Sequence, residues 1–208
     1  MRAAVAAVAV AVALGACGST SKQPTASATA ADAPAVTQSA DAFGRIPELV
    51  KKAQPSIVTV FSERSDARAG AGQGVGSGVI YRPDGIILTN HHVVADASRI
   101  EVGLADGSRI PGRVTATDAD TDLAVIRVDR TGLPAAEFQK SLPQVGSLAV
   151  VLGSPLGFEK TVTAGIVSGL HRSIPGSAAE TRSLVDLIQT DAAISPGNSG
   201  GAVVDANG

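Results

Sequence analysis

The feature that most constrains the fold is a succession of short apolar runs, rich in Val, Ile and Thr, from residue 56 onward. Turn-forming residues separate the runs, and aromatic residues make up only 2% of the chain, so aliphatic side chains must build the core. Because no long amphipathic helix lies between the runs, a parallel sheet with helical crossovers is not expected, and an all-β sandwich or barrel remains. The expected strands are 56–61, 76–81, 85–89, 99–104, 113–118, 123–128, 147–153, 161–170, 184–190 and 201–204.

Turn signals indicate how these strands are grouped. Asp84-Gly85 and Asp106-Gly107 are dipeptides typical of hairpin turns. Residues 132–147 are rich in turn formers and divide the strands into two sets. We therefore expect two small β units, 44–131 and 148–208, joined by that linker.

Before the first strand, residues 45–53 place apolar side chains at helical spacing, which predicts a short amphipathic helix.

The N-terminal residues are not expected to belong to the fold. Residues 1–17 contain one basic residue and then an apolar run that ends in Leu-Gly-Ala-Cys, which suits a signal peptide and resembles a bacterial lipobox. Cys17 is then the lipid attachment site and anchors the protein to a membrane. The alternative is an ordinary secretory signal in which Cys17 is incidental. Residues 18–43 hold mainly Ala, Ser, Thr, Pro and Gln, a composition that predicts a disordered tether.

Charge and glycine content exclude several functions. The net charge is −2 without any basic block, so nucleic acid is not an expected partner. The stretch "GAGQGVGSG" at 70–78 lacks the Gly-Lys-Ser/Thr signature and the following helix of a phosphate-binding loop. We expect it to be a mobile loop leading into a strand. No cofactor and no metal site are expected.

Ser199 stands in a glycine-rich frame that suits a nucleophile. A serine hydroxyl needs a base to take its proton and hydrogen-bond donors to hold the oxyanion that forms. Gly197 permits a tight turn, so that the N–H groups of the segment Gly197, Asn198 and Ser199 can form an oxyanion hole, and Gly200 adds no bulk. The alternative is an ordinary turn, because Asn, Gly and Ser are common turn residues.

A base and an acid are available upstream of this serine. His91 and His92 follow an expected strand, where neighbouring side chains point to opposite sides, so only one of them can face a cleft. Asp122 stands directly before an apolar strand, with Asp118 and Asp120 as competitors that also suit solvated turn positions. The order His, Asp, Ser is that of chymotrypsin-type proteases.

Four separated motifs together resemble the HtrA/Deg-type serine proteases, the extracytoplasmic quality-control branch of the chymotrypsin-like fold. They are "GSGVIYRPDGIILTNHHVV", "DADTDLAVIRV", "VLGSPLGFEKTVTAGIVSG" and "QTDAAISPGNSGGAVVD". The resemblance implies a two-barrel fold and assigns the catalytic roles to His92, Asp122 and Ser199. It also implies cleavage of unfolded or damaged proteins and, in many members, a homotrimer with a PDZ domain.

Two departures from the digestive proteases refine this expectation. Asn198 replaces an Asp that pairs with a newly cut N-terminus, so activation by such cleavage is not expected. Ala193 stands where a trypsin-like pocket has a carboxylate, and Asp191 lies two residues too early. A pocket formed by Ala193 and Ile194 is therefore expected to favour small aliphatic side chains.

The end of the chain affects the expected activity. "VVDANG" is an apolar strand followed by a hairpin turn without its returning strand, so we expect the second barrel to be incomplete and the sequence to be truncated. Two alternatives to a protease remain. One is a catalytically incompetent, chaperone-like binding lipoprotein that keeps the protease fold, and the other is a purely structural surface protein.

Overall fold

A computed structural model describes residues 43–66, 70–154, 161–174 and 184–208. The predicted signal peptide with Cys17, and all but the last residue of the predicted tether, lie outside the described residues. Within the ranges that are described, no helix is both long enough and apolar enough to span a bilayer.

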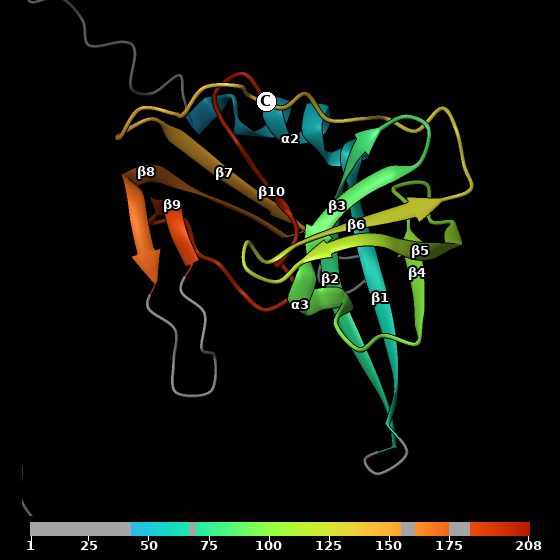
Figure 1. Ribbon diagram of the computed structural model, residues 1–208. Helices are drawn as coiled ribbons and strands as arrows, with labels where there is room; N and C mark the ends of the chain where they lie inside the picture. The colour runs from blue at the N-terminus through green and yellow to red at the C-terminus, as the bar shows by residue number, and fades with distance from the viewer. Residues whose placement is uncertain (1–42, 67–69, 155–160, 175–183) are drawn as a thin grey trace, which may run out of the picture. The chain divides into compact units, whose positions relative to one another are not determined.

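The described chain is all-β, as predicted, and ten strands match the ten expected runs. Six strands form a closed antiparallel barrel in the order β1-β2-β3-β6-β5-β4, and four form an open sheet in the order β10-β7-β8-β9 (Figure 1). The strands are β1 (Ile57–Asp66), β2 (Gly70–Arg82), β3 (Ile86–Asn90), β4 (Arg99–Gly103), β5 (Arg109–Asp118), β6 (Leu123–Val128), β7 (Leu148–Gly153), β8 (Thr161–Ile174), β9 (Leu184–Thr190) and β10 (Ala202–Val204). Both hairpin dipeptides form turns, with positive φ at Gly85 (99°) and Gly107 (84°).

The barrel core consists of aliphatic side chains from alternate strand positions. Val58 and Val60 of β1, Ile87 of β3 and Ile126 of β6 are completely buried. This alternation fits strands with one face toward a closed interior. The low aromatic content of the chain therefore reflects a narrow barrel filled by branched residues.

The predicted helix is present as α2 (Ile46–Ala53) and packs between the two β units. Its buried side chains Leu49 and Ala53 join an apolar cluster with Val79 of β2 and Leu148 and Val150 of β7. A short 3-10 turn, η1 (Gln54–Ser56), leads from α2 into β1. This cluster gives the two units a shared apolar core.

The second unit is an open sheet in the part of the chain that is described. Strands β9 and β10 are its edges, and the side chains of Val185 and Val203 are exposed. A groove of about 770 Å³ lies between residues 135–143, the end of α2 and the sheet. The difference between a closed first unit and an open second unit is the main asymmetry of the fold.

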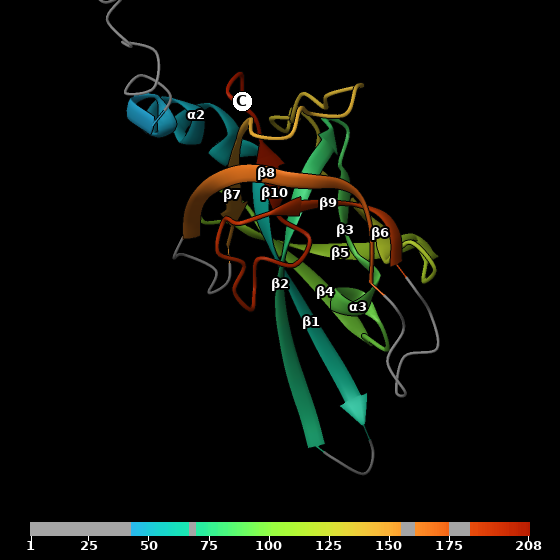
Figure 2. The same ribbon diagram turned by 90° about the vertical axis from the view of Figure 1, so that its left-hand side faces the viewer.

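The expectation of a mobile loop at 70–78 was wrong, because strand β2 begins at Gly70 and pairs with β1 from there to Val79. Figure 2 shows these two strands as a hairpin that extends beyond α3 (His91–Val94). A Cβ at Gly76 would lie 2.7 Å from the nearest Val93 methyl carbon, and one at Gly78 would lie 2.9 Å from Ile87. Gly76 and Gly78 are therefore required by close packing rather than by flexibility.

We predict that Gly78→Ala destabilises the fold by about 1–3 kcal/mol, since the added methyl overpacks the barrel between Val58 and Ile87. The matched control is Gly72→Ala in the same strand, where nothing lies within 4 Å of the added carbon. Urea unfolding of both variants measures the difference. Equal unfolding midpoints for the two variants would contradict the packing argument.

Candidate active site

The pairing register of β3 with β6 brings the predicted acid to the predicted base. Asn90 pairs with Leu123, so Asp122, one residue earlier, lies beside the start of α3. The His91 N–H donates to the Asp122 carbonyl at 3.0 Å, and Asn90 Nδ2 donates to the same oxygen at 2.8 Å. The strand order and these two bonds fix the backbone of Asp122 next to the histidines.

His92 and Asp122 form a two-point contact. Asp122 Oδ2 lies 2.7 Å from His92 Nδ1, and Oδ1 accepts the His92 backbone N–H at 2.9 Å. Asp122 has a φ of 55°, an unusual conformation that Asp tolerates better than most residues. With the proton on Nδ1 and directed to the carboxylate, Nε2 is left free to act as a base.

The reasoning that separated His91 from His92 was wrong in its geometry. Both residues lie in a single helical turn, α3, and not in an extended strand. Consecutive helical residues still diverge by about 100°, so the two rings do not share a direction. Nδ1 of His91 is buried without a partner among the described residues, whereas the His92 side chain is 57% exposed.

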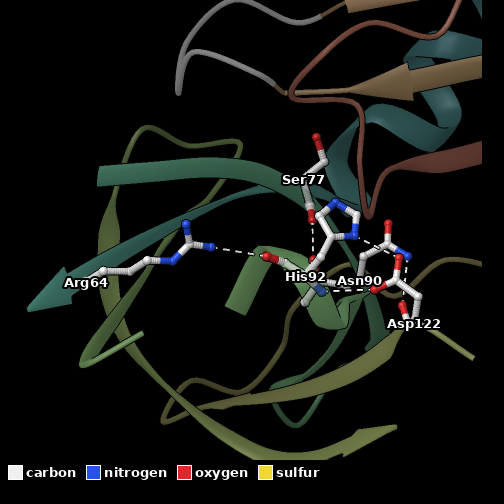
Figure 3. A network of polar contacts seen from close by, with 6 residues as sticks. Arg64, Ser77, Asn90, His92 and Asp122 are labelled. Atoms are coloured by element: carbon white, nitrogen blue, oxygen red, sulfur yellow. Dashed lines mark hydrogen bonds and ion pairs between the residues drawn. The ribbon is translucent and has the colours of Figure 1, made fainter. Parts of the chain in front are cut away.

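Arg64 approaches α3 from the side opposite to Asp122 (Figure 3). It donates from Nη2 to the His92 carbonyl at 3.3 Å and from Nε to the Ala95 carbonyl at 3.1 Å. A cation at the C-terminal end of a helical turn stabilises its unpaired carbonyls. Sequence reasoning missed both Arg64 and Asn90, although Asn90 directly precedes the histidine pair.

The glycine-framed serine lies on a tight loop between β9 and β10. The loop is held internally, since the Asn198 N–H donates to the Ser195 carbonyl at 3.0 Å and the Gly201 N–H donates to the Asn198 carbonyl at 2.8 Å. Within the described ranges, the N–H groups of Gly197 and Ser199 have no acceptor. Of the three residues predicted to form the oxyanion hole, Gly197 and Ser199 therefore each have a backbone N–H without an acceptor in the described ranges, whereas the Asn198 N–H is already bonded.

Asn198 differs from its two neighbours in this loop. The residue is only 6% exposed, and neither Nδ2 nor Oδ1 has a partner in the part of the chain that is described. The amide packs against Gly153, at the end of β7. Among the described residues, its side chain therefore makes no hydrogen bond that would order the loop.

The loop is attached to the first barrel through Ser77 of β2. The Ser77 N–H donates to the Ser199 carbonyl at 2.8 Å, and Ser77 Oγ donates to the Gly197 carbonyl at 2.6 Å. A Cβ at Gly76 would lie 2.7 Å from Val93 of α3 and 3.3 Å from the Ser199 carbonyl oxygen. The loop and the turn that carries His92 therefore approach the same point of β2.

The predicted specificity residues follow β9. Ile194 is 69% exposed, and the Ala193 carbonyl accepts a bond from Thr163 Oγ1 at 2.7 Å. The Asp191 carboxylate accepts the Ile166 N–H of β8 at 2.7 Å and is thereby tied to the sheet. The Asp191 carboxylate, two residues before Ala193, therefore fixes the segment that leads to the Ser199 loop.

Comparisons with known proteins identify the family. The trypsin-like peptidase domain family matches residues 76–208. The chain belongs to this family. The resemblance to HtrA/Deg-type proteases is also confirmed, because the relatives of this chain include HhoB and DegP-like proteases and its structural neighbours include HtrA-type proteases.

Three of these similar proteins show the extent of the likeness. The putative serine protease HhoB of Synechocystis sp. (strain ATCC 27184 / PCC 6803 / Kazusa) is 40% identical over 78% of this chain and 45% of its own length. The probable periplasmic serine endoprotease DegP-like protein of Pseudomonas putida (strain W619) is 44% identical over 71% of this chain and 30% of its own. The solved structure of the HtrA-type protease AlgW with a tripeptide gives a TM-score of 0.67 at 38% identity, over 77% of this chain and 50% of its own. The trypsin-like peptidase chain therefore spans half or less of the length of these relatives.

We predict that Asp122→Gly selectively exposes the His92 amide to solvent exchange. Glycine adopts the left-handed conformation without strain, and the variant loses only the carboxylate. A bond to a charged group contributes about 1.5–3 kcal/mol, so exchange at His92 should rise roughly 10- to 100-fold. The adjacent His91 amide, which donates to the carbonyl of residue 122, is the internal control. Amide exchange followed by NMR measures both, and equal acceleration at the two amides would contradict the two-point contact.

Proposed function

We propose that this chain contains the catalytic residues of a serine endopeptidase, with Ser199 as nucleophile, His92 as general base and Asp122 as the group that orients the base. The observation that supports this most strongly is the His92–Asp122 contact, with Nδ1 at 2.7 Å from Oδ2. The attachment of the Ser199 loop to the same barrel adds to it.

The proposed reaction follows from these positions. Ser199 Oγ attacks the substrate carbonyl carbon while Nε2 of His92 takes its proton, and Asp122 stabilises the imidazolium that forms. The N–H groups of Gly197 and Ser199 donate to the oxyanion. His92 then protonates the leaving amine, and an acyl group remains on Ser199 until water, deprotonated by His92, releases it.

The proposed substrates are unfolded or damaged proteins outside the cytoplasm. A relative named as a periplasmic serine endoprotease supports both the reaction and the location. We propose a preference for small aliphatic side chains before the cleaved bond, because Ala193 carries no charge and the Asp191 carboxylate is bonded to β8. The resemblance to HtrA/Deg-type proteases is the basis for proposing a homotrimer.

We predict that Ser199→Ala and His92→Ala each abolish casein cleavage by the complete protein, whereas His91→Ala keeps most of it. Loss of a triad member lowers the rate on the order of 10⁴-fold or more. His91→Ala is the matched control, since it removes the neighbouring ring on the same turn. Turnover by purified Ser199→Ala, or an inactive His91→Ala beside an active His92→Ala, would refute the assignment. Absence of cleavage by wild type with intact casein binding would favour the chaperone-like alternative.

We also propose that the mature protein is held at a membrane by lipid on Cys17, as its lipobox-like setting suggests. Cys17→Ser should move the protein from the membrane fraction to the soluble fraction, since several acyl chains together anchor a protein firmly. Labelling with an alkynyl fatty acid, followed by fractionation, tests this. Equal labelling of wild type and Cys17→Ser would exclude Cys17 as the anchor.

A further inference from the structure

Ser77 is a completely buried residue whose polar groups are all engaged. Its hydroxyl donates to the Gly197 carbonyl at 2.6 Å and accepts the Ser154 N–H at 2.8 Å. Its N–H donates to the Ser199 carbonyl at 2.8 Å, and its own carbonyl accepts Thr89 Oγ1 at 2.7 Å. One residue of the first barrel thus binds the loop on both sides of Asn198.

These bonds fix successive peptide planes of the loop. The plane between Gly197 and Asn198 is held at both ends, by Ser77 Oγ on its carbonyl and by the Ser195 carbonyl on its N–H. The next carbonyl, of Asn198, accepts the Gly201 N–H, and the Ser199 carbonyl accepts the Ser77 N–H. Three consecutive carbonyls are therefore restrained, while the N–H groups of Gly197 and Ser199 have no acceptor among the residues that the structure describes.

We propose that Ser77 is a positioning residue that orders the oxyanion donors through its hydroxyl; this rests on the proposed function of Ser199. Donors for an oxyanion act strongly only when they are preorganised. Gly197, with a φ of 94°, has little conformational restraint of its own. The Asn198 side chain has no hydrogen-bond partner among the described residues, so it cannot supply the order that Ser77 supplies.

The hydroxyl is the part of Ser77 that substitution can remove selectively. Ser77→Ala keeps the backbone bond to Ser199 but leaves the Gly197 carbonyl without its donor and the Ser154 N–H without its acceptor. Ser62→Ala is a matched control, because Ser62 is also almost completely buried in the barrel and its Oγ has no partner in the described part of the chain. Ser77→Cys is a second variant that avoids a cavity and provides only a weak donor.

Two readouts on the complete protein test the proposal. The first is amide exchange at Asn198, which should accelerate roughly 10-fold in Ser77→Ala as its peptide plane loosens, and less than twofold in Ser62→Ala. The second is steady-state cleavage of a peptide anilide, in which kcat should fall about 10- to 100-fold in Ser77→Ala while KM changes less than threefold. Ser77→Cys should give intermediate values.

The two readouts separate the ordering role of Ser77 from the proposed function of Ser199. Unchanged exchange at Asn198 in Ser77→Ala, or an equal fall of kcat in Ser62→Ala, would overturn the role of Ser77. Accelerated exchange together with a wild-type protein that never cleaves would leave the ordering role standing and refute the proposed function of Ser199. If Ser77→Ala does not fold, Ser77→Cys decides by the same two measurements.

Discussion

The hydrogen bonds between Ser77 and the loop of Ser199 are the contact on which the proposed site depends. The first unit supplies His92 and Asp122, and the second supplies the serine, so the site exists only while the two units keep their places. A buried carbonyl or N–H left without a partner costs about 1–3 kcal/mol, which makes this attachment hard to break and hard to shift. The apolar cluster of α2, β2 and β7 adds a second contact between the two units.

Strand register sets the other half of the site. Pairing of Asn90 with Leu123 places Asp122 one residue before the start of β6, where its carboxylate contacts the backbone nitrogen and Nδ1 of His92. A slip of one residue would reverse every side chain of β6 and expose Ile126, which is completely buried. Barrel packing therefore protects the geometry of His92 and Asp122, even though the histidine itself is largely exposed.

Sequence reasoning predicted the strands because β-branched runs and turn dipeptides are local signals. It missed the first half of β2, since glycine has low strand propensity and the pairing of residues 70–75 with β1 leaves no local signal. The four residues of α3 are too few for a helical period to show. Ser77 could not be found, because Ser154 and Gly197 lie 77 and 120 residues away from it. Among the clustered aspartates, the family resemblance assigned the role to Asp122, and the register places Asp122 beside His92.

The most direct test of the account is a crystal structure of the protein after reaction with a peptidyl phosphonate. The account predicts an adduct on Ser199 Oγ, with a phosphonyl oxygen about 2.7–3.1 Å from the nitrogens of Gly197 and Ser199. Ser77 Oγ should still donate to the Gly197 carbonyl in that structure. An adduct on another residue, or an oxygen turned away from both nitrogens, would contradict the account.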